Sequence, residues 1–358
     1  MEKRIQHLIH KDQSHHGVYI LYWMQQSQRV EYNHALIHAI HLANERNLPL
    51  YVYFGLTSQY PGANQRHYAF MLEGLKETFS SLQKLGISVV FQQSEPDVGI
   101  LSWIENADAI VFDLGYLRIQ RLWRKHVYQA ILEKPAHPDL YSVESDVVVP
   151  VRIASEKLEY GAYTLRPKIN RLRDEFLQEA SLPSLKVSTS SSQIDGSAME
   201  CPNSLNHTVL KSRFYQGGYI SAKKHLAVFM KNFAHYKDSS DPSVDITSHL
   251  SMYLHFGQIS PVEIALSIRN LDADEQLKEA FLEQLIVRRE LAMNFVFYNE
   301  NYDQFDFITE PWAYRTMQAH QSDPREYVYT QNDYLSFSTH DPYFNAAMKE
   351  MVFTGYMH

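Results

Sequence analysis

The chain has 358 residues, of which 45% are hydrophobic and 13% aromatic, so it can bury a large core, and its length suggests two domains. Its formal net charge of −8 argues on its own against binding to nucleic acid. Any DNA-binding face therefore has to be a local cluster of positive charge. The single cysteine, Cys201, excludes an internal disulfide and a metal site built from several cysteines.

Membrane and metal signals are weak. The opening residues are too polar for a signal peptide, and no later apolar run approaches the length that spans a bilayer. We therefore expect neither secretion nor membrane insertion, and a cytoplasmic location. The 18 histidines show no HExxH or similar ligand spacing, so we expect no metal site and interpret them as scattered surface and core imidazoles.

Short runs of β-branched and aromatic residues alternate with helical periodicity in the first half of the chain. The predicted strands are residues 17–23, 48–55, 87–92, 109–113 and 139–144. Apolar stripes at helical spacing run from Leu36 to Ala43 and from Phe70 to Leu85. Strict alternation predicts an α/β domain with a parallel sheet covered on both faces. Such a sheet usually binds a ligand beyond the carboxyl ends of its strands, but no GxGxxG or Walker A loop indicates which ligand.

Residues 181–206 are rich in Ser, Pro and Asn and poor in large apolar side chains, a composition that cannot form a packed core. We predict a surface linker here, between an α/β domain of residues 1–180 and a second domain of residues 207–358. The second domain shows helical periodicity and no comparable series of strands, so it should be all-α. Its predicted helices are residues 221–233, 261–271, 275–291 and 342–353.

One of these helices places polar side chains beside an apolar run. Gln284 and Arg288 lie one helical turn apart, and Arg289 falls on a different face. A plain interpretation is that both arginines pair with neighbouring glutamates on a solvated helix face. The alternative is a binding role, because a guanidinium can stack on a base and offers forked donors.

The stretch DITSHLSMYLHFGQISP, residues 245–261, forms a polar turn before a helix. Thr247, Ser248 and Ser251 place three hydroxyls and their backbone N–H groups around this turn, which suits an anionic phosphate. Serines alone are better explained as a helix cap, because capping serines are common. The full string is more specific, because it contains the pattern T-S-x-L-S-x-Y-L-x-x-G-x-I-S.

That string resembles the photolyase and cryptochrome flavoproteins. Further stretches resemble the class II cyclobutane pyrimidine dimer (CPD) DNA photolyases within that family, and the resemblance runs over nearly the whole chain. These stretches are YWMQQSQRVEYNHAL (22–36), AYTLRPKINRL (162–172), LIVRRELAMNF (285–295) and THDPYFNAAMKEMVFTGYMH (339–358). The resemblance implies a Rossmann-like, parallel-sheet α/β domain of the antenna type, followed by an all-α FAD-binding domain.

By this resemblance the protein is expected to act as a deoxyribodipyrimidine photo-lyase. It would repair pyrimidine dimers in UV-damaged DNA by light-dependent electron transfer from reduced FAD, as a monomer. The implied FAD contacts are Tyr236, Thr247, Ser248, His249, Leu250 and Ser251. The implied contacts with the dimer are Gln284, Arg288 and Tyr329. The family pattern also allows an antenna chromophore in the first domain, whose identity the sequence does not indicate.

Two clusters of cations offer a local DNA-binding face, RIQRLWRKH at residues 118–126 and RPKINRLR at residues 166–173. The first is better explained as the solubilising face of a helix. By the resemblance, the second leads into the linker between the domains.

The chain departs from the family pattern at four places. Gln284 stands where the family has a glutamate that contacts the dimer, and Met293 interrupts the usual ELADNF motif. Phe344 replaces a tryptophan of the chain that carries electrons to the flavin. GYMH (355–358) matches the start of a family segment that continues into a tryptophan-bearing helix and a turn at the isoalloxazine ring.

Neither the helix nor the turn is present, so we expect an incomplete flavin site, in a fragment or in the product of a shortened gene. Two alternatives to repair remain. A flavin photoreceptor, cryptochrome-like, would share the fold, and an inactive fragment or scaffold would hold neither flavin nor dimer.

Overall fold

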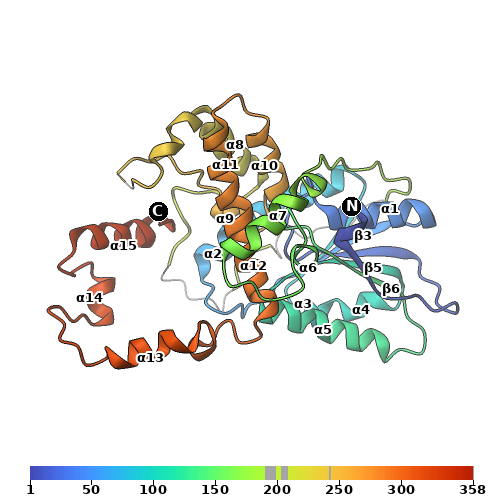
Figure 1. Cartoon of the computed structure of the whole chain (residues 1–358). Coiled ribbons are helices and arrows are strands. Elements are labelled where there is room, and N and C mark those ends of the chain that lie inside the picture. Colours follow the sequence, from blue (N-terminus) through green and yellow to red (C-terminus); the bar gives the residue numbers. More distant parts are fainter. Residues whose placement is uncertain (190–198, 203–208, 242, 358) are drawn as a thin grey trace.

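The computed structural model describes residues 1–189, 199–202, 209–241 and 243–357 (Figure 1). Six strands form one sheet in the order β1-β6-β5-β2-β3-β4. Their bounds are Ile5–Ile9 (β1), Tyr19–Trp23 (β2), Leu50–Gly55 (β3), Ser88–Gln92 (β4), Ala107–Asp113 (β5) and Asp139–Val143 (β6). Strands β2 to β6 run parallel, as predicted, whereas β1 pairs antiparallel with β6. The sequence pattern did not indicate β1, because this half-exposed edge strand lacks a continuous apolar run.

Alternate residues of the central strands face two layers of helices. Ile20 and Tyr22 of β2 pack with α1 and α2, whereas Leu21 and Trp23 pack with α4 and α5 on the other face. These and the neighbouring helices are α1 (His34–Arg46), α2 (Gln65–Lys84), α3 (Pro96–Gly99), α4 (Leu101–Ile104) and α5 (Arg118–Leu132). Because both faces are covered, β2 and β5 are buried along their whole length.

The part after the sheet is helical. Within the described residues from 209 onward there is no strand, which agrees with the predicted all-α domain. The helices are α6 (Val151–Ala154), α7 (Ala162–Phe176), α8 (Tyr219–Lys231), α9 (Ser251–His255), α10 (Pro261–Arg269), α11 (Glu275–Leu282), α12 (Arg289–Tyr298), α13 (Pro311–Ala319), α14 (Gln331–Leu335) and α15 (Pro342–Thr354). Short 3₁₀ turns are η1 (Glu2–Arg4), η3 (Phe233–Asp238) and η5 (Phe305–Phe307). None of the described helices is both long and apolar enough to cross a membrane.

The helical part has its own hydrophobic core, built from α7, α8, α10 and α11. The predicted linker, residues 181–206, lies partly outside the described residues. Where it is described, Leu182, Leu185 and Met199 pack against the core formed by the sheet with α1 and α2. Those parts of the predicted linker therefore cover the α/β domain.

Helices α11 and α12 are joined without a break by a π-helical segment, η4 (Glu283–Arg288). The helix predicted for residues 275–291 is thus present and extends to Tyr298. The π segment was not predicted, and such segments are frequent at functional sites because they change the direction of side chains within a helix. It contains Gln284 and Arg288.

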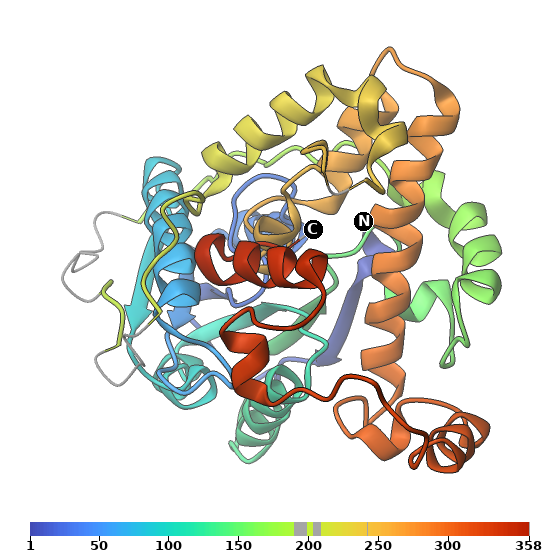
Figure 2. The same ribbon diagram turned by 90° about the vertical axis from the view of Figure 1, so that its left-hand side faces the viewer.

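Residues 301–357 form an arm that carries α13, α14 and α15, and none of these three helices has a buried residue. The arm lies to one side of the domains in Figure 1 and in front of them in Figure 2. The carboxyl-terminal end of the arm is hydrogen-bonded to the rest of the protein. Arg66 of α2 donates to the carbonyl of Val352 at 3.0 Å, and the Ser212 hydroxyl donates to that of Thr354 at 2.7 Å.

Candidate functional site

One face of α12 joins the helical part to the α/β domain. The Glu290 carboxylate accepts the backbone N–H of Val148, and that of Val149 at 3.2 Å. One turn further on, the Asn294 side-chain oxygen accepts the N–H of Glu159 at 2.8 Å. Glu290 and Asn294 are both buried, so this face of the helix is held against the segment that follows β6.

A buried arginine reinforces the same junction from the α/β domain. Arg29 is fully buried, pairs with Asp146 at 2.6 Å and donates to the carbonyl of Gly257 at 3.0 Å. Gly257 has φ +62, and a Cβ there would lie 1.9 Å from the carbonyl oxygen of Gln26, so only glycine fits. Arg289 of α12 donates to the Asp146 carbonyl at 2.6 Å. Arg289 therefore belongs to the domain junction.

Burial changes the acid–base behaviour of this junction. It raises the pKa of Glu290 to about 8, although two backbone N–H donors and the nearby Arg289 and Arg4 favour the charged form. Burial also lowers the pKa of Arg4 to about 10. Burial thus disfavours the charged form of both groups, and each depends on its polar partners.

The opposite side of the same long helix carries Gln284 and Arg288, and both are exposed. Arg288 Nε lies 3.3 Å from Glu283, which also accepts two hydrogen bonds from Arg166 of α7 at 2.7 and 3.0 Å. These bonds from Arg166 lower the pKa of Glu283. The plain interpretation, pairing with a neighbouring glutamate, thus holds for Arg288. Because its side chain is 55% exposed, the guanidinium still has donors that face solvent.

The two predicted cation clusters differ in what they contact. In the first, Arg118 pairs with Asp303 at 2.5 Å and Arg124 is buried against Asp113 at 3.0 Å, so the cluster mainly serves structure. In the second cluster, Arg166 pairs with Glu283, which also pairs with Arg288. This cluster therefore reaches the side of the molecule where Arg288 is exposed.

The loop before α9 presents a set of donors. His249 adopts the left-handed conformation (φ +51) and Leu250 the right-handed one (φ −96, ψ −7), a sequence that turns successive N–H groups to one side and suits anions. Among the residues that the structure describes, the N–H groups of Thr247, Ser248 and His249 have no hydrogen-bond acceptor. The Thr247 hydroxyl, by contrast, bonds to that of Tyr356 at 2.9 Å.

Side chains within this loop hold it in place. The His249 ring bonds to Tyr215 at 3.0 Å and to Asp245 at 2.5 Å, and Leu250 is buried. Ser251, at the start of α9, is exposed and borders the cavity described below. The backbone and the serine hydroxyls, rather than the His249 ring, are therefore available to a phosphate, and this donor set fits one.

The remaining predicted residues lie in two aromatic clusters. Tyr236 stacks on Phe233 with ring centroids 5.7 Å apart and packs edge-on against Phe281 of α11. Tyr329 lies on the arm, where its hydroxyl bonds to the His340 ring. Within the described part of the chain, Tyr329 makes no hydrogen bond or ring contact with Gln284 or Arg288, the two other proposed dimer contacts.

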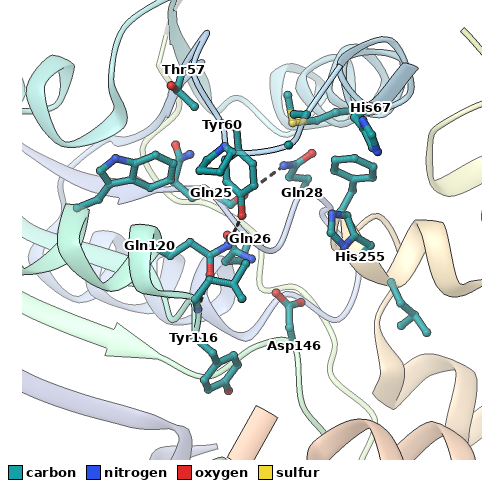
Figure 3. Close-up of a pocket in the computed structure, with 18 of the residues that line it drawn as sticks. Gln25, Gln26, Gln28, Thr57, Tyr60, His67, Tyr116, Gln120, Asp146 and His255 are labelled. Carbon is teal, nitrogen blue, oxygen red and sulfur yellow. Dashed lines mark hydrogen bonds between the residues drawn. The ribbon is translucent and has the colours of Figure 1, made fainter. Parts of the chain in front are cut away.

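A cavity of about 610 Å³ lies at the carboxyl ends of β2, β3 and β5, next to α9 and α12. The Gln120 amide donates to Gln26 at 2.6 Å and to the Tyr60 hydroxyl at 3.5 Å (Figure 3). His67 and His255 lie together on another side of it (Figure 3). Its aromatic lining comprises Phe54, Tyr60, Tyr68, Tyr116, Trp123 and Phe256.

The sequence predicted that a ligand would bind at this edge of the sheet, but it did not indicate the lining residues. A usable signal was the run Gln25, Gln26 and Gln28 directly after a buried strand, because amides at a strand end point into the crevice. The aromatic residues come from distant segments, so only the fold brings them together.

Comparisons with known proteins find similarity to DNA photolyases. The DNA photolyase family model matches residues 20–186. The deoxyribodipyrimidine photo-lyase of Methanothermobacter thermautotrophicus is 41% identical, and the match covers 99% of this chain and 78% of that protein. The protein of the same name from Arabidopsis thaliana is 32% identical, with 95% and 71% covered.

Solved structures with the same fold include a bacterial class III photolyase from Agrobacterium tumefaciens, at a TM-score of 0.72 and 18% identity, covering 96% of this chain and 71% of that one. A Synechocystis cryptochrome has a TM-score of 0.70 at 15% identity, covering 96% and 73%. An archaeal photolyase from Sulfolobus tokodaii, described with two FAD molecules, has a TM-score of 0.66 at 16% identity, covering 95% and 72%. At these identities the likeness confirms the fold class alone.

Proposed function

Because the chain belongs to the DNA photolyase family, we propose that it repairs cyclobutane pyrimidine dimers in UV-damaged DNA, using light and reduced FAD. The observation that carries this proposal is the 41% identity, over 99% of the chain, to a protein named deoxyribodipyrimidine photo-lyase. Reduced FAD, when bound, supplies an electron to the dimer and takes it back after the cyclobutane ring has split. The class II assignment rests on the sequence motifs described above.

The loop before α9 would hold the phosphates of FAD. Its unpartnered N–H groups and the hydroxyls of Ser248 and Ser251 supply donors, while His249 and Leu250 keep the loop in shape. Tyr236 would contact the cofactor through its aromatic ring. These residues favour FAD over an uncharged ligand, because a row of donors without acceptors fits a negatively charged group.

Gln284 and Arg288 would meet the damaged bases. A dimer that has left the base stack can meet only side chains that are accessible from outside the protein, as these two are. The Gln284 amide can donate to a thymine carbonyl, and the Arg288 guanidinium can stack on a base or fork onto its oxygens. Arg166 holds Glu283 and so limits the directions that Arg288 can take. Tyr329 is the third candidate, from the arm.

The cavity at the strand ends would hold a second, light-harvesting chromophore. Its volume falls within the usual range for small-molecule sites, roughly 300–1,000 Å³, and its aromatic walls with a few amides suit a flat conjugated ring. The archaeal relative from Sulfolobus tokodaii, described with a second FAD, supports a flavin-like occupant.

The proposal is tested by mixing the protein with excess FAD, reducing the flavin chemically, and illuminating an oligonucleotide that carries one thymine dimer. We expect intact thymines to form in blue light and not in the dark, as measured by chromatography. Ser248→Ala combined with Ser251→Ala should lose bound flavin, whereas Ser267→Ala, on α10, should retain it. Retention of stoichiometric FAD by the double variant would contradict the assignment of the loop.

The two alternatives give different results in the same experiment. A photoreceptor would bind FAD and show no preference for dimer-containing DNA. An inactive scaffold would bind neither. Either result would overturn the repair proposal.

A further inference from the structure

Two histidines of the edge-strand region, His7 and His10, have their rings side by side, which the geometry of a regular strand would not allow. His7 lies in β1 and His10 follows it, and in a regular strand residues three apart point to opposite faces. The pairing shifts register between His7 and Ile9, which oppose Tyr141 and Leu140 respectively. This extra residue on β1 is a β-bulge, which re-aims the side chains after it. The two imidazole rings consequently lie with centroids 3.8 Å apart.

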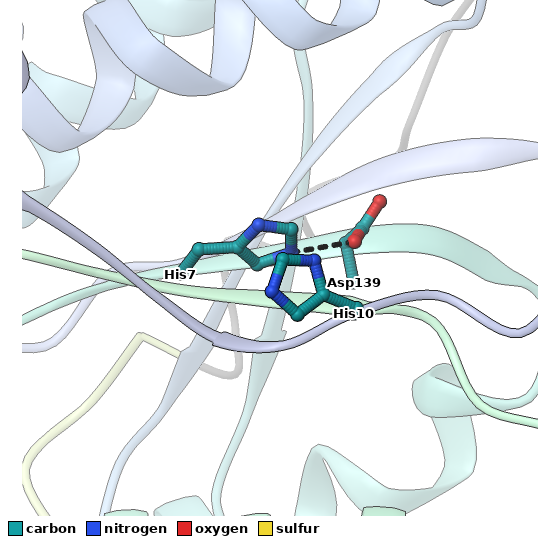
Figure 4. A group of neighbouring side chains, drawn as sticks. All are labelled: His7, His10 and Asp139. Atoms are coloured by element: carbon teal, nitrogen blue, oxygen red, sulfur yellow. Dashed lines mark hydrogen bonds and ion pairs between the residues drawn. The ribbon is translucent and has the colours of Figure 1, made fainter.

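A buried carboxylate from the neighbouring strand faces the same pair. Asp139, at the start of β6, has Oδ1 2.6 Å from Nε2 of His7. Ligand atoms of His7, His10 and Asp139 all lie within 4.8 Å of one another (Figure 4). Two imidazoles and one carboxylate form a ligand set found in zinc sites, in which water takes the fourth position.

Neighbouring groups hold Asp139 ready as a ligand. Its Oδ1 accepts the backbone N–H of Lys11 at 2.9 Å, and its Oδ2 accepts Arg46 at 2.6 Å. These two donors and the His7 ring orient both carboxylate oxygens before any ion binds. Asp108 pairs with both Arg46 and the Lys11 ammonium, at 2.5 and 2.7 Å, which offsets their positive charge.

Ring packing also orients the histidine in the strand. His7 stacks on Tyr141 of β6 with centroids 4.2 Å apart, so its ring is fixed before any ion binds. His10 is exposed and makes its ring contact with His7, so it can turn by the small amount that a metal–nitrogen bond of about 2.0 Å requires.

We propose that His7, His10 and Asp139 bind one divalent transition-metal ion, with Zn²⁺ as the ion that best fits the donors. The ion would join edge strand β1 to β6 and so stabilise the edge of the sheet, with a fourth position open to solvent. None of the residues proposed for FAD or DNA takes part, so the metal site does not depend on the proposed function.

The test uses tag-free protein stripped with a chelator. We expect one equivalent of Co²⁺ to give the visible absorption typical of a four-coordinate site. One equivalent of Zn²⁺ should displace the Co²⁺ and abolish this absorption. Mg²⁺, which prefers oxygen ligands, should leave the absorption unchanged. Zn²⁺ should also raise the melting temperature. His10→Gln should weaken Zn²⁺ binding by about tenfold or more, because loss of even an outer partner of a ligand costs about that much.

His16→Gln is the matched control, an exposed histidine on the same segment, and should bind Zn²⁺ as the wild type does. His7→Gln serves as a second variant if His10→Gln melts early in metal-free buffer. Equal Zn²⁺ affinity in wild type and both site variants, or absence of a stoichiometric Co²⁺ spectrum in the wild type, would overturn the proposal.

Discussion

Arg288 and Arg289 are neighbours in the sequence but serve different sides of one helix. Arg288 has a side chain that is 55% exposed, beside Gln284. Arg289 donates to the Asp146 carbonyl at the junction with the α/β domain. One face of the helix is thus open to a ligand, while the other holds the two domains together. Substitutions on the two faces should therefore differ in kind, binding on one side and stability on the other.

The ionic contacts of the two faces differ in the same way. Around Arg288 the charges are largely in water, where an ion pair contributes little to stability. Around Arg289 they are buried, and removing one partner leaves another charge without compensation. The predictions below test this difference, beginning with the largest effect.

Glu290→Ala should cause the largest loss. It would leave the buried N–H groups of Val148 and Val149 without an acceptor, at a cost of about 3–5 kcal/mol in the free energy of unfolding. Denaturant unfolding measures it. Glu279→Ala, which breaks an exposed pair on α11, should cost less than about 1 kcal/mol, and equal losses in the two variants would show that the faces do not differ.

The free energy of unfolding should also depend on pH through Glu290. Its folded pKa of about 8 lies above the ordinary value of 4.5, so the folded state binds the extra proton. The contribution is fully present below pH 4.5 and is lost as pH rises to about 8, with a total change on the order of 5 kcal/mol. Glu290→Gln should flatten this slope, whereas Glu279→Gln should not. Parallel curves for wild type and Glu290→Gln would contradict the burial of an ionisable group at this junction.

Asn294→Ala should have an intermediate effect. Its side chain accepts the N–H of Glu159 and donates to the carbonyl of Lys157 at 3.0 Å, so truncation leaves both groups short of a partner. We expect a loss of about 2 kcal/mol in unfolding free energy, without a change in the ratio of affinities for damaged and undamaged DNA. A change in that ratio would place Asn294 on the binding side of the helix.

The sequence predicted much of the fold because its signals are local. The five parallel strands are apolar runs that read clearly, and helical periodicity located α1, α2 and the long helix through Arg288. Edge strand β1 was missed, since IQHLI mixes polar and apolar residues. The π segment was missed as well, because nothing in the residue pattern distinguishes it from an α-helix.

The site was less predictable because it depends on the packing of the domains. Helical spacing placed Gln284 and Arg288 on one helix, but only the structure separates their exposed face from the buried face that carries Glu290 and Asn294. The position of Tyr329 on the arm, bonded to His340, likewise does not follow from sequence. The donor-rich loop before α9 was predictable as a polar turn that opens onto a helix, since its residues are contiguous.

The most direct test of the open face is the affinity for a duplex with one thymine dimer, compared with the same duplex undamaged, over a series of salt concentrations. Both affinities should fall with salt, because phosphate contacts release counterions. Arg288→Ala should reduce the preference for the damaged duplex by about tenfold, the range of one good base contact. Arg269→Ala, an exposed arginine on α10, should leave it unchanged. Equal weakening of both duplexes by Arg288→Ala would contradict the account, because Arg288 would then contact phosphate alone.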